Sequence, residues 1–294
     1  YKRQAFKLFC LRRELKMLIV ESQSLEVYRN LAIEEYLMDR VVDQGPILFL
    51  WRSDRAVVIG KNQNPWRECR LDRMAEDDIP LARRISGGGA VYHDEGNLNY
   101  CVIVDREAYR QEQAFELVVQ TLAGFGIHAE KTGKSDLSVD GRKFSGNAFS
   151  FRRGRALHHG TLLLRTDLER LGRYLGSMIE GIETRAIASV PADVMNLGLG
   201  VQELMRALAD TFASLYGGRT QPARWSDAEL PSPALRSLIN RQSSAEWQYG
   251  ATPRFTVEID GFRVTVEQGI VTADEHLDRG WAGRPFIRWS SCGI

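Results

Sequence analysis

The sequence predicts a mixed α/β domain followed by a smaller α/β piece. Stretches with apolar residues three or four positions apart, typical of amphipathic helices, alternate with short β-branched and apolar runs typical of strands. Residues 217–233 are rich in glycine and proline, which indicates a linker. Beyond this segment, apolar and polar residues alternate at 255–259 and 262–266 around Asp260 and Gly261, which predicts a β-hairpin with one apolar face.

The first part is expected to open with a strand at residues 18–20 and a helix at 25–42, in which Val27, Leu31 and Met38 lie near one face. The other expected elements follow in chain order: strands at 47–51 and 56–59, a helix at 66–77, an extended segment at 81–84, a glycine loop at 86–89, strands at 90–92 and 98–104, a helix at 107–124, short strands from 127 to 164, and helices from 166 and at 201–215.

Two local signals mark turns and helix starts within this order. Asp140 and Gly141 are typical of a two-residue hairpin turn. Residues 166–169 have the sequence Thr-Asp-Leu-Glu, a capping-box pattern in which Thr166 would cap the helix.

We expect three segments along the chain. Residues 1–16 are basic and are interpreted as an extension ahead of a natural start at Met17. Residues 17–223 form the main domain. Residues 224–294 form a short accessory domain, whose last residues lack a periodic pattern and have the character of a truncated tail.

The bulk composition is that of a packed, soluble, globular protein, with 44% hydrophobic and 26% charged residues and a formal net charge of +1. A charge so close to zero gives no support for general nucleic-acid binding, and no apolar run approaches the roughly 20 residues needed to cross a bilayer. The scattered Cys10, Cys69, Cys101 and Cys292 fit a reducing cytoplasm rather than a disulfide framework or zinc ribbon. We therefore expect a cytoplasmic monomer without a nucleic-acid or membrane partner.

The most informative stretch is residues 83–94, in which Arg84 precedes three consecutive glycines. Successive free backbone N–H groups of such a loop can form an anion-binding nest. Arginine adds a planar cationic fork that suits phosphate or carboxylate. The residues alone therefore indicate either a phosphate-binding loop or an ordinary flexible turn.

Two later segments are also candidates. Lys143 follows the hairpin turn and precedes small residues, so it either projects into a pocket as a point charge or lies on the surface. His158 and His159 are adjacent on an expected strand and point to opposite faces, so they cannot easily hold one metal ion. One of them either lines a polar pocket or is a satisfied core histidine.

Residues 133–135, Gly-Lys-Ser, imitate the end of a Walker A loop. The glycine that this motif requires five positions before Gly133 is His128 instead, so the tight first turn would be missing. We therefore do not expect a P-loop NTPase.

Taken together, these segments resemble the lipoate–protein ligase family over about residues 17–270. The similar stretches are Asn-Leu-Ala-Ile-Glu-Glu at 30–35, Val-Ile-Gly-Lys-Asn-Gln-Asn-Pro-Trp at 58–66, the run at 83–94, the lysine motif at 142–146, His-His-Gly-Thr-Leu-Leu-Leu at 158–164 and Glu-Trp-Gln-Tyr-Gly at 246–250. The resemblance implies the mixed-sheet biotin/lipoate-ligase α/β fold, related to class II aminoacyl-tRNA synthetases, with a small C-terminal α/β accessory domain that is truncated here.

The resemblance also implies an ATP-dependent ligase. Members of the family join lipoate and ATP into lipoyl-adenylate with magnesium. They then pass the lipoyl group to a lysine on the lipoyl domains of 2-oxoacid dehydrogenase E2 subunits or on glycine-cleavage H protein.

The family's functional positions can be carried onto this sequence. The catalytic lysine falls on Lys143 and the expected Mg²⁺ contact on Asp136. The ATP-binding positions fall on Arg84, Gly89, Ala90, Val91, Tyr92 and Lys143. The lipoate or adenylate pocket falls on Trp51, Ser86, Gly87, Gly88, His93, Lys143, His159 and Gly160.

Two other functions compete with this hypothesis. Octanoyl and lipoyl transferases share the fold but use no ATP, and instead form a thioester on a pocket cysteine. Residues 130–143 and 184–197, where relatives of that type carry it, contain no cysteine. A catalytically inactive carrier-binding homologue is the other alternative, and the presence of Lys143, Arg84 and the full glycine loop argues against it.

Overall fold

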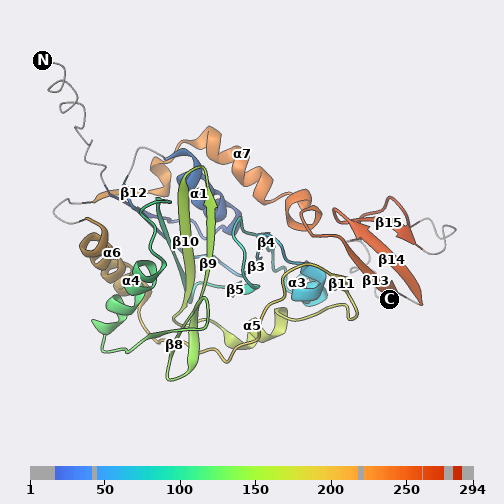
Figure 1. Ribbon diagram of the computed structural model, residues 1–294, viewed down its shortest axis with the longest axis horizontal. Coiled ribbons are helices and arrows are strands. Elements are labelled where there is room, and N and C mark those ends of the chain that lie inside the picture. Colours follow the sequence, from blue (N-terminus) through green and yellow to red (C-terminus); the bar gives the residue numbers. More distant parts are fainter. Residues whose placement is uncertain (1–16, 42–44, 218–221, 260, 275–280, 287–294) are drawn as a thin grey trace, which may run out of the picture.

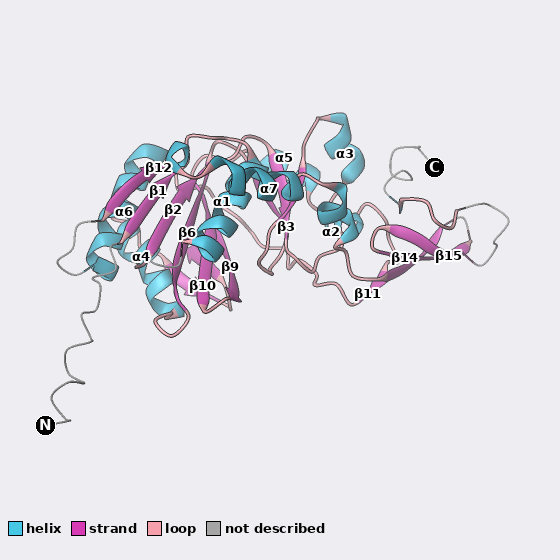
Figure 2. Ribbon diagram, turned by 90° about the horizontal axis from the view of Figure 1, so that it is seen from above, coloured by secondary structure: helices cyan, strands magenta, loops and turns pink. Residues whose placement is uncertain are grey.

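The computed structural model describes residues 17–41, 45–217, 222–259, 261–274 and 281–286. A large sheet carries helices on both faces, and a smaller sheet lies at one end of an elongated molecule (Figures 1 and 2). The expected extension at residues 1–16 lies outside the described residues.

The large sheet has eight strands in the order β12-β1-β2-β6-β10-β9-β8-β7. β1 runs parallel to both β12 and β2, and every pair from β2 to β7 is antiparallel. In chain order the strands are β1 (Leu18–Glu21), β2 (Ile47–Trp51), β6 (Asn97–Asp105), β7 (Glu130–Thr132), β8 (Asp136–Val139), β9 (Arg142–Arg152), β10 (Arg155–Leu163) and β12 (Ala223–Ser226).

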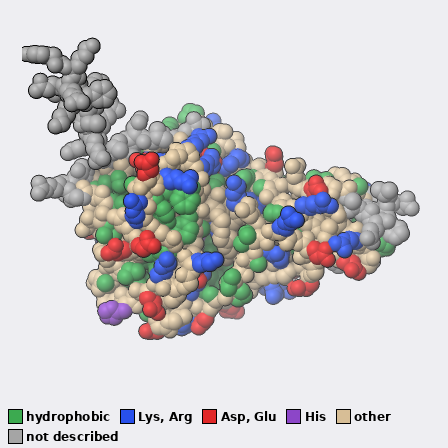
Figure 3. Space-filling model, in the orientation of Figure 1, with side chains coloured by type: hydrophobic (Ala, Val, Ile, Leu, Met, Phe, Trp, Pro, Cys, Tyr) green, Lys and Arg blue, Asp and Glu red, His purple; other side chains and the backbone are tan. Residues whose placement is uncertain are grey.

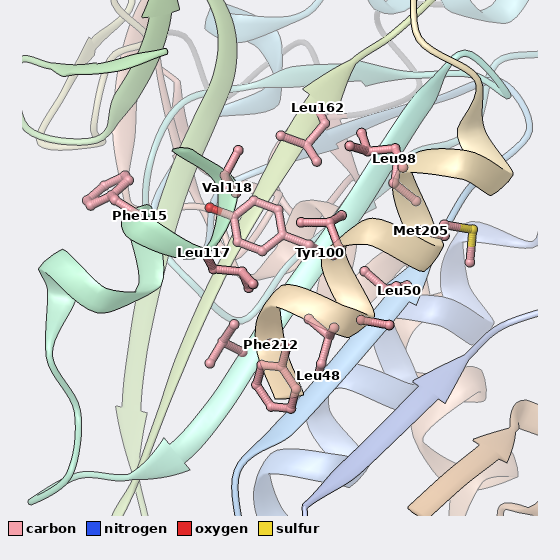
Figure 4. Close-up of a cluster of buried hydrophobic side chains, with 14 of the residues drawn as sticks. Leu48, Leu50, Leu98, Tyr100, Phe115, Leu117, Val118, Leu162, Met205 and Phe212 are labelled. Carbon is pink, nitrogen blue, oxygen red and sulfur yellow. The ribbon is translucent and has the colours of Figure 1, made fainter. Parts of the chain in front are cut away.

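Both faces of this sheet are buried. Helices α4 (Gln111–Ala123) and α6 (Val201–Gly217) cover one face, and together they enclose the apolar cluster of Figure 4, which includes Tyr100 and Phe212. Helices α1 (Val27–Arg40) and α7 (Ser232–Gln242) cover the other face. Successive strand residues point to opposite sides, which explains why β6 and β10 are buried almost throughout.

A three-stranded sheet, in the order β4-β3-β5, adjoins the large one. Its strands are β3 (Ala56–Ile59), β4 (Leu81–Arg83) and β5 (Val91–His93), and three short helices lie near them: α2 (Pro65–Glu68), α3 (Leu71–Glu76) and α5 (Leu168–Tyr174). The single helix expected at 66–77 is therefore wrong. Cys69 and Arg70 leave the helical path because Cys69 forms a bridge with Leu175 and the Arg70 N–H donates to the Tyr174 carbonyl at 2.9 Å.

The C-terminal sheet has the order β11-β13-β14-β15, with β11 (Glu183–Thr184), β13 (Phe255–Ile259), β14 (Phe262–Glu267) and β15 (Ile270–Asp274). The expected hairpin is confirmed by the antiparallel pairing of β13 with β14. Its apolar face packs on the main domain, since Phe255 and Val257 share a buried cluster with Trp66. β11 and β15 were not anticipated by the sequence pattern.

Arg83 ties this end of the chain to the three-stranded sheet. The side chain is fully buried, and its guanidinium donates to the carbonyl oxygens of Gly60, Lys61 and Gln63. It also donates to acceptors in and after the π-helical turn η2 (Glu246–Gly250), namely the carbonyl oxygens of Trp247 and Gln248 and the hydroxyl of Thr252.

The expected linker at 217–233 is wrong for the residues that the structure describes. Ala223–Ser226 form β12 at the edge of the large sheet, and a 3-10 turn, η1 (Asp227–Glu229), leads from it toward α7. Leu230 and Leu235 are buried against α1 in the core of the main domain. The expected boundary between residues 223 and 224 therefore cuts through this layer. Local composition could not predict β12, because β1, the strand that pairs with it, lies near the start of the chain.

The start of α5 also differs from expectation. Asp167, not Thr166, is the N-cap residue, and its carboxylate accepts the Arg170 N–H at 3.0 Å. The Thr166 N–H donates to the side-chain oxygen of Asn196 and the Thr166 carbonyl accepts the Asn196 side-chain amide, which holds Thr166 outside the cap position.

The described surface gives two further facts. No helix in the described ranges is long and apolar enough to cross a membrane. On the face shown in Figure 3, Lys and Arg side chains are interspersed with Asp and Glu side chains, in line with the near-neutral net charge.

Candidate active site

A cavity of about 600 Å³ lies between the eight-stranded and the three-stranded sheet, and residues of both line it. Most of the residues singled out from the sequence meet there. Those that line it are Trp51, Arg84, Gly88, Gly89, Ala90, Val91, His93, Asp136, Lys143, His159 and Gly160. Ser86, Gly87 and Tyr92 do not line this cavity, and each has a different place described below.

Arg84 holds the backbone of the glycine loop in place. Its guanidinium donates to the carbonyl oxygens of Gly87 at 2.6 Å and Gly89 at 2.7 Å, and to that of Val58 at 3.1 Å. Burial lowers the pKa of Arg84 to about 10, which leaves it positively charged near neutral pH. Gly88 has φ +83°, and a Cβ there would lie 2.9 Å from an Arg84 nitrogen, so this position requires glycine. Arg84 thus fixes the loop as well as bordering the cavity.

A buried chain of hydrogen bonds connects α1 to the glycine loop. Glu34 Oε2 lies 2.7 Å from Nδ1 of His159, and Nε2 of the same ring lies 2.6 Å from the Ser86 hydroxyl. Glu34 is 1% exposed and also accepts the indole N–H of Trp51 at 3.0 Å. The order of groups is that of a Ser-His-Glu triad. However, Ser86 accepts a bond from Arg84 and does not line the cavity, so it supports the lining residues Arg84 and His159 from behind.

Lys143 is placed by the hairpin that the sequence predicts. Asp140 and Gly141 have φ of 50° and 77° and turn β8 into β9, which confirms the turn. The Lys143 ammonium lies 2.9 Å from Asp136 Oδ1. The Lys143 N–H donates to the Asp193 carbonyl at 2.9 Å, so the returning chain fixes the start of β9. The lysine is partly exposed, as an ammonium that meets a substrate must be.

A second cavity of about 440 Å³ adjoins the first, and Lys143, Ala90 and Val91 line both. Tyr92 lines the second cavity, because its side chain points away from that of His93 on β5. Its ring packs against Tyr174 with a centroid distance of 5.4 Å. Lys143 therefore lies where the two cavities share a wall.

Part of the first cavity is apolar. Leu31, Trp51 and Val58 line it and belong to the core between the large sheet and α1. His93 contacts Trp51 edge-on at 5.4 Å between ring centroids. Burial, followed by the positive charge of Arg84, lowers the pKa of His93 to about 3, so its imidazole is neutral. This region suits an uncharged chain.

Gly160 is required by its neighbours rather than by its own conformation. A Cβ at this position would lie 2.3 Å from the Asn147 side-chain oxygen and 2.8 Å from the ring of Tyr100. Asn147 Oδ1 also accepts the Tyr100 hydroxyl at 2.5 Å and lies 3.0 Å from His158 Nε2. Any side chain at residue 160 would break this network.

The segment at 187–190 borders both cavities. The Ser189 hydroxyl accepts the Ala90 N–H at 2.9 Å and the Gln63 side-chain N–H at 3.0 Å, and the Ser189 N–H donates to Glu68 at 2.9 Å. These bonds hold the segment against the end of the glycine loop.

Sequence reasoning missed Glu34, Lys134, Asn147 and Ser189 as residues of the cavity. One of them carried a signal. Glu34 lies seven residues after Val27 and four before Met38, so it occupies the buried face of an amphipathic helix, where an unpaired carboxylate would be costly. Ser189 lies in a loop, where periodicity gives no information.

The structure describes two of the four cysteines, Cys69 and Cys101. Cys69 and Cys101 are fully buried, and burial raises the pKa of both thiols well above the usual range. Neither lines a cavity that contains Lys143. Cys10 and Cys292 lie outside the described residues.

This fold and site define an α/β catalytic domain of the biotin/lipoate-ligase type. The family model of the lipoyl protein ligase A/B catalytic domain matches residues 26–213, and the chain belongs to this family. It is 38% identical over 257 residues to a lipoate-protein ligase A from Bdellovibrio bacteriovorus, covering 84% of this chain and 76% of that protein. It is 37% identical over 277 residues to one from Blochmanniella pennsylvanica, covering 90% and 81%.

Solved structures are similar over the same region. P. falciparum LipL1 in complex with lipoate has a TM-score of 0.70 and 28% identity, covering 87% of this chain and 82% of that one. A lipoate-protein ligase A bound with ATP has a TM-score of 0.64 and 27% identity, covering 81% and 99%. A bipartite lipoate protein ligase from Thermoplasma acidophilum, solved in work on the ligase and its E2 lipoyl domain, has the same TM-score and identity, covering 81% and 97%.

Proposed function

We propose that this chain is an ATP-dependent lipoate–protein ligase, which activates lipoate as lipoyl-adenylate and transfers the lipoyl group to a lysine of a carrier domain. Its family membership and its similarity to lipoate-bound and ATP-bound proteins support this function. The single observation that carries it is the position of Lys143, which lines both the first cavity, with its apolar region and glycine loop, and the second cavity, lined by Ala90, Val91 and Tyr92.

The two cavities suit the two substrates. The region around Leu31, Trp51 and Val58 would take the hydrocarbon chain and dithiolane ring of lipoate, because it is apolar and His93 in it is neutral. The second cavity, lined by Tyr92 and Ala90, would take the adenosine of ATP. The α-phosphate would then lie at the wall shared with the first cavity, which Gly88 and Gly89 line. The lipoate carboxylate and the α-phosphate would then meet at Lys143.

The proposed first step forms one bond and breaks one. A carboxylate oxygen of lipoate attacks the α-phosphorus of ATP, and the bond to the bridging oxygen of the β-phosphate breaks, which releases pyrophosphate. Negative charge on the α-phosphate oxygens must be countered as this happens. The ammonium of Lys143 would counter it, since a charge already held in place by Asp136 needs little reorganisation.

The proposed second step transfers the acyl group. A neutral lysine amine of the carrier attacks the lipoyl carbonyl carbon, AMP leaves, and the amine loses a proton to form the amide. Lipoyl domains of 2-oxoacid dehydrogenase E2 subunits and glycine-cleavage H protein are the carriers that we propose. The Thermoplasma ligase, described with its E2 lipoyl domain, supports the first of these.

Magnesium fits this site in one way. Mg²⁺ in nucleotide sites is commonly held by one or two carboxylates together with phosphate oxygens and water. The described residues include no group of three or more His, Cys, Asp and Glu side chains that could hold a metal ion alone. Asp136 does present one carboxylate to the cavity beside Lys143. We propose that Asp136 binds the ion together with ATP, and that the ion supplies neutralising charge to the phosphates.

The setting of the enzyme is also a proposal. We expect a monomer that acts in the cytoplasm, where the buried Cys69 and Cys101 would stay reduced. We also propose that the catalytic unit extends through α7, because β12 and α7 complete its central layers.

The test of the proposed function is lipoate-dependent exchange of labelled pyrophosphate into ATP, followed by mass analysis of a lipoyl domain. We expect exchange only with lipoate or a close acyl analogue, and a mass increase of one lipoyl group on the carrier. Transfer without ATP would favour the transferase alternative. Carrier binding without exchange would favour an inactive homologue.

A further inference from the structure

We propose that the turn between β7 and β8, residues 133–135, is the subsite for the β- and γ-phosphates of ATP, and that Lys134 holds the pyrophosphate as it leaves. This inference rests on the proposed function and names a residue that the family resemblance did not supply. The same turn is the Gly-Lys-Ser sequence that imitates a Walker A loop.

The position of the turn is the first argument. Gly133, Lys134 and Ser135 all line the first cavity, together with Asp136 and Lys143. Lys134 is two residues before Asp136, whose carboxylate lies 2.9 Å from the Lys143 ammonium. Lys143 lines both cavities, so a nucleotide with its adenosine in the second cavity and its α-phosphate at Lys143 can extend its remaining phosphates into the first cavity, toward this turn.

Charge is the second argument. Three cations line the first cavity, and two of them are already engaged. Arg84 donates to the carbonyl oxygens of the glycine loop, and Lys143 is paired with Asp136. Among the described residues, Lys134 has no ion pair and no side-chain hydrogen bond. It is exposed, so its ammonium can move onto an anion without leaving a carboxylate unpaired.

The rigidity of the turn is the third argument. The Ser135 carbonyl accepts two bonds from Asn147, one from the backbone N–H at 2.8 Å and one from the side-chain amide at 3.0 Å. The Lys134 carbonyl accepts the Gln111 side chain at 3.3 Å. Asn147 is itself held by Tyr100 and His158. The backbone of the turn is thus fixed before substrate arrives, which reduces the entropy lost on binding.

The chemistry resembles a Walker A lysine, but the architecture is different. In a P-loop the lysine follows a long glycine-rich loop and opens a helix. Here Gly133, with φ +55°, is part of a short hairpin turn, and β8 follows it. A point charge on a fixed turn is the shared feature. The subsite would bind ATP and pyrophosphate, and it would contact neither AMP nor lipoyl-adenylate.

The test compares Lys134→Ala with Lys134→Arg and with a control, Lys131→Ala. Lys131 is three residues away, and its ammonium lies 4.9 Å from the centre of the Phe115 ring and does not line the cavity. For each variant, the KM values for ATP and for pyrophosphate are measured in the exchange reaction. Transfer to a lipoyl domain is then measured from supplied lipoyl-adenylate, a step in which no pyrophosphate takes part.

For Lys134→Ala we expect both KM values to rise about 10-fold, the scale of one lost contact to a charged group. Transfer from lipoyl-adenylate should stay within about two-fold of the wild type, and Lys134→Arg should recover most of the loss. Unchanged KM values, or an equal loss in Lys131→Ala, would overturn the proposal. An equal fall in adenylate-dependent transfer would also overturn it, because the residue would then be structural. If the wild type shows no lipoate-dependent exchange, the proposed function fails instead.

Discussion

His158 and His159 are neighbours on β10 and both are buried, yet they lie on opposite faces of the large sheet. His159 faces α1. One of its ring nitrogens binds Glu34 of that helix, and the other binds Ser86 at the start of the glycine loop. His158 faces α4, among the rings of Phe115 and Phe149 at 5.0 and 4.6 Å. One histidine is part of the cavity wall and the other is part of the core.

The comparison extends to the two faces as a whole. The face toward α1 carries buried charges, Glu34 and Arg84, that are bound to polar groups around the cavity. The face toward α4 and α6 is filled by apolar side chains, and burial lowers the pKa of His158 to about 3. Two adjacent histidines thus have different surroundings because successive residues of a strand point to opposite faces of the sheet. Substitutions of residues bound around the cavity should change activity, and substitutions in the core should change stability.

The largest effect should come from Lys143→Ala. Adenylate formation should fall about 10²–10³-fold, the scale for losing one preorganised electrostatic contact at a reacting phosphate. Stability should change by no more than about 0.5 kcal/mol, because the side chain is partly exposed. Arg142→Ala is the control, since Arg142 is exposed and pairs with Asp193. Pyrophosphate exchange measures the first effect, and near-normal exchange by Lys143→Ala would refute the assignment.

A smaller effect is expected for Glu34→Gln. The amide can still accept the Trp51 N–H but loses the charge beside His159, so adenylate formation should fall about 10-fold. The neighbouring Glu35→Gln is the control. Glu35 is buried and pairs with Arg152 and Arg241, away from the cavity, so its loss should lower the melting temperature while exchange stays normal. The opposite pattern would mean that Glu35, and not Glu34, supports the site.

Two buried histidines, His158 in the core and His93 at the cavity, should make the protein sensitive to acid. An unfolded chain protonates histidine near pH 6.5, whereas folded His158 and His93 bind a proton only near pH 3. Stability is therefore full above pH 6.5 and is lost as the pH falls, by about 1.4 kcal/mol per pH unit for each histidine. His158→Gln should reduce this slope by the contribution of one proton, while the glutamine amide can still donate a hydrogen bond to Asn147. Urea unfolding between about pH 6.5 and pH 4.5 gives the slope of the free energy of unfolding against pH for each protein. Equal slopes for the wild type and His158→Gln would contradict the expectation.

The smallest effect is expected from replacing the cysteines. Cys69 and Cys101 are buried with raised thiol pKa values, and neither lines a cavity that contains Lys143. A variant with all four cysteines changed to alanine or serine should, once folded, still transfer lipoate in the presence of ATP. Loss of transfer in a folded variant, restored by Cys69 or Cys101 alone, would favour a thioester mechanism.

Much of this architecture follows from local sequence signals. The strands at Ile47–Trp51 and Ala56–Ile59 and the turn at Asp140 and Gly141 agree with the expectation from composition and periodicity. The misses share a cause. β12, the break between α2 and α3, and the cap of α5 each depend on a partner far along the chain, which no window of sequence contains.

The site follows the same division. Arg84, Lys143, His159 and the glycine loop were found because their motifs are long and unusual. Asn147 and Ser189 were not, because their importance lies in bonds to the β7–β8 turn and to Ala90. Tyr92 was expected among the ATP-binding residues; it lies on β5, and the direction of its side chain places it in the second cavity and not in the first.

The burial of Arg83 affects when the structure around it can form during synthesis. Its guanidinium needs acceptors from residues 60–63 and from residues 247–252, and it is fully buried once it has them. A nascent chain leaves the ribosome N-terminus first, so this cation lacks the second set of acceptors until residue 252 has emerged. Because Arg84 is the next residue, the glycine loop reaches its final support only then. A ribosome that stalls before residue 252 would therefore release a product with most of the catalytic motifs but without the clamp that holds their backbone in place.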